Sequence, residues 1–179
     1  MAKSSDREPG LGQQGSLPDD APAAPPAVDA APDSQQAAWE AELAAPGFTY
    51  IDEQLRDRAY VDAEFPSSVE LDETTELVPW SIPRGKRLTM DEVRAAMITD
   101  GITPATPQHG PKYAPEQPDG TTIWIPQLSE SADALGYRRV VDLNRDGECC
   151  EFDRHWRHPS YQWSGGDQFL GARTKSSNA

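Results

Sequence analysis

The chain has 179 residues, of which 36 % are apolar, and its net charge is −14. This length predicts one domain with residues to spare, and the low apolar share places part of the chain outside a core. The acidity lies in residues 1–80, which hold 4 Lys and Arg against 17 Asp and Glu, whereas residues 81–179 hold 12 against 13. Because an acidic arm is repelled by phosphate backbones, we expect no nucleic-acid partner.

Three further features bear on location. No stretch approaches the roughly 20 apolar residues of a membrane helix, so we expect no membrane partner. The first residues carry charges with no apolar run behind them, so no secretory signal is predicted. The only cysteines, Cys149 and Cys150, are adjacent and cannot link distant parts of a fold. A reducing cytoplasm is therefore the expected location.

The N-terminal part is expected to hold little independent structure. Residues 1–33 are rich in Ala and Pro and have few side chains large enough to offset the entropy of ordering, which predicts a disordered arm. Residues 34–80 form an acidic segment with one or two short helices. The first is predicted over 34–45, and a second over 49–61 could be capped by Thr49. The rest of the segment is expected to be irregular.

Apolar side chains recur at helical spacing in this acidic segment. Trp39 and Leu43 lie four residues apart, as do Ile51 and Leu55, so each pair shares a helix face. Helices this short are marginal alone and need a surface to pack on. That surface belongs either to the same chain or to another protein. We take these four side chains as candidate partner-binding residues.

The clearest predicted element is a helix over 90–100. Thr89 and Glu92 have the spacing of a capping box, in which each side chain accepts from the backbone N–H of the other. Gly101 suits the left-handed position that ends a helix. These signals predict both ends of the helix.

The last third of the chain is rich in β-forming residues. Strands are predicted over 121–125, 137–143, 148–152 and 168–173. A turn at 144–147 would join the second and third of them as a hairpin. One capped helix followed by four short strands favours the α+β class. We therefore expect a small domain over 82–175 with one helix and a short antiparallel sheet.

One segment has the spacing of a calcium-binding loop. Asp142, Asn144, Asp146 and Asp153 fall at positions 1, 3, 5 and 12 of a loop that resembles those of EF-hands and, more closely, of dockerins. Cys150 at position 9 is a poor ligand for a hard ion, and the residues after the turn favour a strand rather than a helix. The alternative interpretation is the hairpin, with Asn144 and Asp146 supplying turn chemistry.

The cysteines and histidines allow two more hypotheses. Cys149, Cys150, His155 and His158 are of the residue types that bind zinc. Cys150 with His155 or His158 could instead form the nucleophile and base of a small hydrolase. Vicinal cysteines on a strand point to opposite faces, which argues against one shared metal. No nucleophile or phosphate-binding motif accompanies them, and we do not favour an enzyme.

Aromatic residues are dense near the C-terminus. Trp156, Tyr161 and Trp163 lie close to Arg154 and Arg157. Exposed aromatic and arginine side chains are typical of protein-recognition surfaces. We therefore take these three aromatic side chains as further candidate partner-binding residues.

Four segments carry a resemblance to known proteins: DGITPAT, YAPEQPDGTTIWIPQL, GYRRVVDLNRDG and WSGGDQFLGAR. Over about residues 88–175 the chain resembles small uncharacterised bacterial proteins, often from mobile-element or prophage surroundings. The resemblance implies an accessory protein of bacterial origin. It implies no activity and no functional residue.

Together these features predict a non-enzymatic accessory or protein-interaction protein. Its acidic arm, residues 1–80, would fold on a protein partner while the domain over 82–175 serves as the anchor. No cofactor is expected. The alternatives are a calcium- or zinc-binding domain that uses residues 142–158 and a small cysteine-dependent hydrolase.

Overall fold

A computed structural model describes residues 32–67 and 69–175, so nearly all of the predicted arm over 1–33 lies outside the described residues. The helices are α1 (Pro32–Ala44), α2 (Arg58–Glu64), α3 (Met90–Thr99) and α4 (Gly110–Tyr113), with 3₁₀ turns η1 (Glu53–Arg56), η2 (Pro107–His109) and η3 (Ala114–Glu116). The strands are β1 (Tyr50–Ile51), β2 (Thr75–Ser81), β3 (Arg87–Leu88), β4 (Thr103–Pro104), β5 (Thr121–Ala132), β6 (Arg138–Asp146), β7 (Cys149–Arg157), β8 (Trp163–Ser164) and β9 (Gln168–Thr174).

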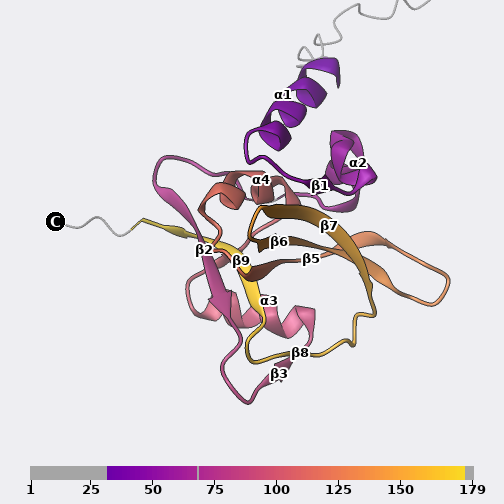
Figure 1. Cartoon of the computed structure of the whole chain (residues 1–179). Coiled ribbons are helices and arrows are strands. Elements are labelled where there is room, and N and C mark those ends of the chain that lie inside the picture. Colours follow the sequence, from indigo (N-terminus) through magenta and orange to yellow (C-terminus); the bar gives the residue numbers. More distant parts are fainter. Residues whose placement is uncertain (1–31, 68, 176–179) are drawn as a thin grey trace, which may run out of the picture.

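One mixed sheet organises this part of the chain (Figure 1). Its strand order is β1-β7-β6-β5-β9-β2, with β4 also paired to β9, and β3 pairs separately with β8. β1 is parallel to β7 and β5 is parallel to β9, while the other pairs in this sheet are antiparallel. The predicted α+β class is confirmed. The predicted single helix and short antiparallel sheet are wrong.

The sheet is larger than predicted because segments outside the expected strands join it. Residues Thr75–Ser81, expected to be irregular, form β2 and pair with β9 along their whole length. An edge strand tolerates Pro79, which lacks a backbone donor. Thr49 does not cap a helix, since its hydroxyl donates to the Cys150 carbonyl at 3.0 Å beside β1. No break in packing therefore separates the acidic segment from the following domain.

Helices cover both faces of the sheet (Figure 1). On one face, α1 and α2 contribute to a core that contains Trp39, Leu43, Val61, Phe65, Ile123, Leu143, Phe152 and Leu170. On the other face, α3 contributes to a core that contains Met90, Val93, Met97, Val140, Trp163 and Phe169. The two sets alternate along β5, β6 and β9, as side chains of a strand must.

The predicted ends of α3 are confirmed. The Glu92 carboxylate accepts from the Thr89 N–H at 2.8 Å, and the Thr89 hydroxyl accepts from the Glu92 N–H at 3.4 Å. Gly101 has a φ of 74°, the left-handed conformation expected just beyond a helix.

The helix predicted over 49–61 is wrong. Asp52 accepts from the Gln54 N–H and caps η1, and Asp57 accepts from the Ala59 N–H and caps α2, both at 2.9 Å. Because an aspartate at a cap starts a new helix, the chain is divided into β1, η1 and α2 where helical spacing alone suggested one element.

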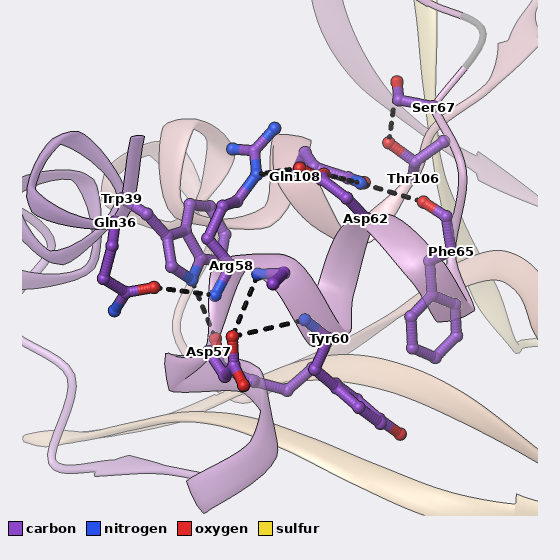
Figure 2. Close-up of polar contacts among 12 residues, drawn as sticks. Gln36, Trp39, Asp57, Arg58, Tyr60, Asp62, Phe65, Ser67, Thr106 and Gln108 are labelled. Carbon is purple, nitrogen blue, oxygen red and sulfur yellow. Dashed lines mark hydrogen bonds and ion pairs between the residues drawn. The ribbon is translucent and has the colours of Figure 1, made fainter. Parts of the chain in front are cut away.

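Polar contacts join the helices and 3₁₀ turns of the acidic segment to one another and to η2, as Figure 2 shows. The indole N–H of Trp39 donates to the Leu55 carbonyl at 2.9 Å. From the other side of α2, the Gln108 amide donates to the Asp62 carboxylate at 3.0 Å and to the Phe65 carbonyl at 2.8 Å. These bonds join α1 to η1 and α2 to η2.

Candidate functional site

The outer edge of β7 is only partly covered. β1 pairs with β7 at Glu151 and Phe152 alone, and the backbone N–H of Asp52 then donates to the Phe152 carbonyl at 2.9 Å. The chain turns away into η1 at this point. Within the described ranges, no strand lies beside the outer edge of residues 153–157.

Cationic and aromatic side chains are paired around this uncovered edge. The guanidinium carbon of Arg139 lies 3.6 Å from the centre of the Trp156 ring. Arg157 lies 5.2 Å from the ring centre of Tyr161, and the Tyr137 and His158 rings are 5.4 Å apart. We define the basic–aromatic edge as Tyr137, Arg138, Arg139, Trp156, Arg157, His158 and Tyr161.

Large apolar surface is exposed here. Trp156 is 42 %, Tyr161 45 % and Tyr137 39 % exposed, and Leu135 in the adjoining turn is 76 % exposed. Exposed aromatic side chains held by neighbouring cations are rigid, so a partner would lose little entropy in ordering them.

Three arginines of the edge lack a neutralising carboxylate. Arg138, Arg139 and Arg157 form no ion pair within the described residues, whereas nearby Arg154 binds Asp52 at 2.7 Å. Burial lowers the pKa of Arg139, and the charge of Arg154 lowers it further. A cation that is already partly desolvated and has no counter-ion gains from an incoming anion. The edge is thus a local cationic surface on an acidic protein.

A second polar group lies on the face of β7 that also bears Arg157 and that is opposite Trp156. The Nε2 atom of His155 is 3.0 Å from an Asp142 oxygen and 3.8 Å from an Asp153 oxygen, and the Trp124 ring packs edge-on against His155 at 5.4 Å. Burial raises the pKa of the Asp142 carboxyl, and the hydrogen bond to Asp142 raises the pKa of His155. The pair therefore retains a proton to a higher pH than His155 would alone.

The surroundings of His109 shift its pKa in the opposite direction to that of His155 and favour the neutral ring. Its Nδ1 accepts from the Thr106 N–H at 2.9 Å, which places the ring proton on Nε2, 3.2 Å from the Val69 carbonyl. Burial lowers the pKa of His109.

The two histidines should give opposite pH dependences of stability. The contribution of His155 is complete below its unfolded pKa of about 6.5 and is lost as pH rises through its higher folded pKa. Neutral His109 loses its contribution as pH falls from about 6.5 toward its lower folded pKa. In urea unfolding across this range, the stability difference between wild type and His155→Gln should shrink at high pH. The difference for His109→Gln should shrink at low pH, and two pH-independent differences would contradict these assignments.

Five of the seven predicted partner-binding residues are buried in the structure, and two are exposed. Trp39, Leu43, Ile51 and Leu55 are 1 %, 4 %, 8 % and 0 % exposed, so they contact their own core rather than a partner. Trp163 is also buried, because β8 pairs with β3 and the Trp163 ring packs 5.4 Å from that of Phe169. Trp156 and Tyr161 are exposed and belong to the basic–aromatic edge.

The predicted calcium loop is a β-hairpin. Asp142 lies opposite Asp153 and Asp146 lies opposite Cys149, so the chain turns at Gly147. The Asn144 amide donates to Glu151 at 3.2 Å. An extended ladder cannot wrap oxygen ligands around one ion, so the predicted ligand set is not assembled. The described residues contain no group of three His, Cys, Asp or Glu side chains placed to hold a metal ion.

The structure also does not bring together the residues of the predicted zinc site or of the predicted cysteine hydrolase. Cys150 packs in the core beneath α1 and α2, where burial raises its thiol pKa. His155 faces the other side of the sheet, beside Asp142, and His158 binds Ser160 at 2.7 Å. Cys149 is exposed while Cys150 is buried. Neither a thiol–imidazole pair nor a shared zinc site is formed by these residues.

Sequence reasoning identified Arg157 but missed Arg138 and Arg139 of the edge. Arg138 and Arg139 lie opposite Arg157 and Trp156 across the β6–β7 ladder. The hairpin turn was predicted, and counting outward from it would have paired these positions. The sequence also contains two clusters of arginine at equal distances before and after this turn, which would have indicated a local positive charge.

Neither protein-family models, curated proteins nor solved structures gave a match to this chain. Among the described residues, no helix is long and apolar enough to cross a membrane.

Proposed function

We propose that the protein is a non-enzymatic, cytoplasmic protein-interaction protein that binds an acidic segment of a partner at the basic–aromatic edge. The observation that carries the proposal is the concentration there of three guanidinium groups without carboxylate partners, beside exposed aromatic rings. Arginine and aromatic residues are those that contribute most to protein–protein interfaces. The resemblance to small bacterial proteins fits an accessory role of this kind.

The proposed interface lies at the edge and not on the acidic segment, where the sequence predicted it. The acidic segment was expected to fold on a partner through Trp39 and its neighbours, but their burial leaves the edge as the surface with exposed aromatic rings beside unpaired cations. The partner's charge follows from the site, since a basic surface selects an acidic segment.

The test uses a fluorescent oligo-glutamate peptide as a probe and measures its anisotropy with increasing protein. Wild type should bind, and binding should weaken as salt rises. The double variant Arg138→Glu/Arg139→Glu should bind about tenfold more weakly or worse. The matched control, Arg84→Glu/Arg87→Glu, makes the same charge change at two exposed arginines, one just before β3 and one within it.

Three results would contradict the proposal. Wild type could fail to bind the peptide, the control variant could lose as much affinity as the edge variant, or a single-stranded oligonucleotide could bind more tightly than the peptide. Thermal unfolding of each variant shows whether a variant that binds the peptide weakly is still folded.

A further inference from the structure

The uncovered part of β7 directs backbone groups outward. The carbonyls of Cys150 and Phe152 accept from Thr49 at 2.7 Å and Asp52 at 2.9 Å, both on the outer side. Along an antiparallel strand, alternate residues point their N–H and C=O groups to opposite sides. Because the β6–β7 register is unbroken, Arg154 and Trp156 also point theirs outward.

Arg154 and Trp156 together have two N–H and two C=O groups on this outer side, and two of these four groups already have hydrogen-bond partners. The N–H of Arg154 donates to the Asp153 carboxylate at 2.7 Å, and the carbonyl of Trp156 accepts from the Arg157 guanidinium at 2.9 Å. The Arg154 carbonyl and the Trp156 N–H have no hydrogen-bond partner in the described part of the chain. The edge thus presents one acceptor and one donor, on either side of His155.

This pattern fits a parallel strand and not an antiparallel one. In an antiparallel ladder, one residue exchanges both of its hydrogen bonds with a single opposite residue. Neither Arg154 nor Trp156 can do so, because each has one group occupied. In a parallel ladder, one residue donates to the residue before its opposite and accepts from the residue after it. A residue placed opposite His155 would bind both open groups and continue the direction of β1.

Charge indicates what the added strand contains. Side chains on either side of the residue opposite His155 would lie on the face of Trp156, where the Arg139 guanidinium is stacked without a carboxylate. Acidic side chains at these positions could reach it. A second copy of the chain is a poor occupant, because the residue opposite His155 must use both its N–H and its carbonyl, and the outward-pointing Arg154 and Trp156 each have one of these groups occupied.

We propose that the outer edge of β7 binds an extended acidic segment as a parallel β-strand, with one residue opposite His155 and acidic residues flanking it. This inference rests on the proposed function and specifies its binding mode. Strand addition to an exposed sheet edge derives affinity from backbone hydrogen bonds and specificity from alternate side chains.

The test compares three capped peptides of about eight alternating Glu and Val residues. One has a normal backbone, one is N-methylated at every Val and one at every Glu. With Val opposite His155, methylation of Val removes the N–H groups that face β7 and should weaken binding at least about tenfold. Methylation of Glu alters the N–H groups that face away and should have little effect.

Amide hydrogen exchange on the full chain gives a second measurement. The Trp156 N–H should exchange freely in the unbound protein and become at least about tenfold slower with saturating unmodified peptide. The His155 N–H points toward β6 and should not change. Equal binding by all three peptides, with no protection of Trp156, would overturn strand addition while leaving charge recognition intact. Failure of every peptide to bind would overturn the proposed function as well.

Discussion

Trp39→Ala is expected to lower the free energy of unfolding by about 3–5 kcal/mol. The Trp39 ring is 1 % exposed, and its indole N–H donates to the Leu55 carbonyl. Its removal leaves a cavity between α1 and the sheet and an unpaired buried carbonyl, which adds to the lost apolar burial. Urea unfolding followed by circular dichroism measures the difference.

Trp156→Ala is the matched control. The same atoms are removed, but Trp156 is 42 % exposed and packs mainly on Arg139. The expected loss is below about 1 kcal/mol. If Trp39→Ala were as mild as the control, α1 would not be docked in solution, and Trp39 would again be available to a partner.

This pair of variants addresses the one question that sequence left open for residues 34–80. Trp39 and Leu43 on one helix face indicate that something buries them, but the same apolar face suits a chain's own core or another protein. The answer depends on long-range packing against β5, β6 and β7, which no local pattern encodes. The burial was predictable, whereas the identity of the covering surface was not.

Local signals predicted α3 and the β6–β7 hairpin well. The Thr89–Glu92 capping box, Gly101 and the turn before Cys149 each depend on residues a few positions apart, so the chemistry that forms them is visible in sequence. β2 and the parallel pairs were missed because their partners lie far along the chain, at β9 and β7. The candidate site depends on both kinds of contact, and the sequence predicted its hairpin and its exposed Trp156 and Tyr161.

The second large effect is expected at Gly171, in the middle of β9. A Cβ atom built there would lie 2.7 Å from the Met97 methyl carbon and 3.1 Å from the Thr103 carbonyl oxygen, and would also overlap the Ile102 side chain. A glycine inside a strand often marks a close approach by another segment, and here it lets the end of α3 and β4 lie against the sheet. Gly171→Ala should lower the free energy of unfolding by about 1–3 kcal/mol.

The cause can be isolated with a double-mutant cycle, because Ile102 supplies one of the overlapping groups. Gly171→Ala should cost less in an Ile102→Ala background, where part of the overlap is absent, and the coupling between the two changes measures the steric term. Arg173→Ala, on the same strand but exposed, should change stability by less than about 1 kcal/mol. Equal costs of Gly171→Ala in both backgrounds would show that Ile102 does not limit the space, and the strain would then come from Met97 or the Thr103 backbone.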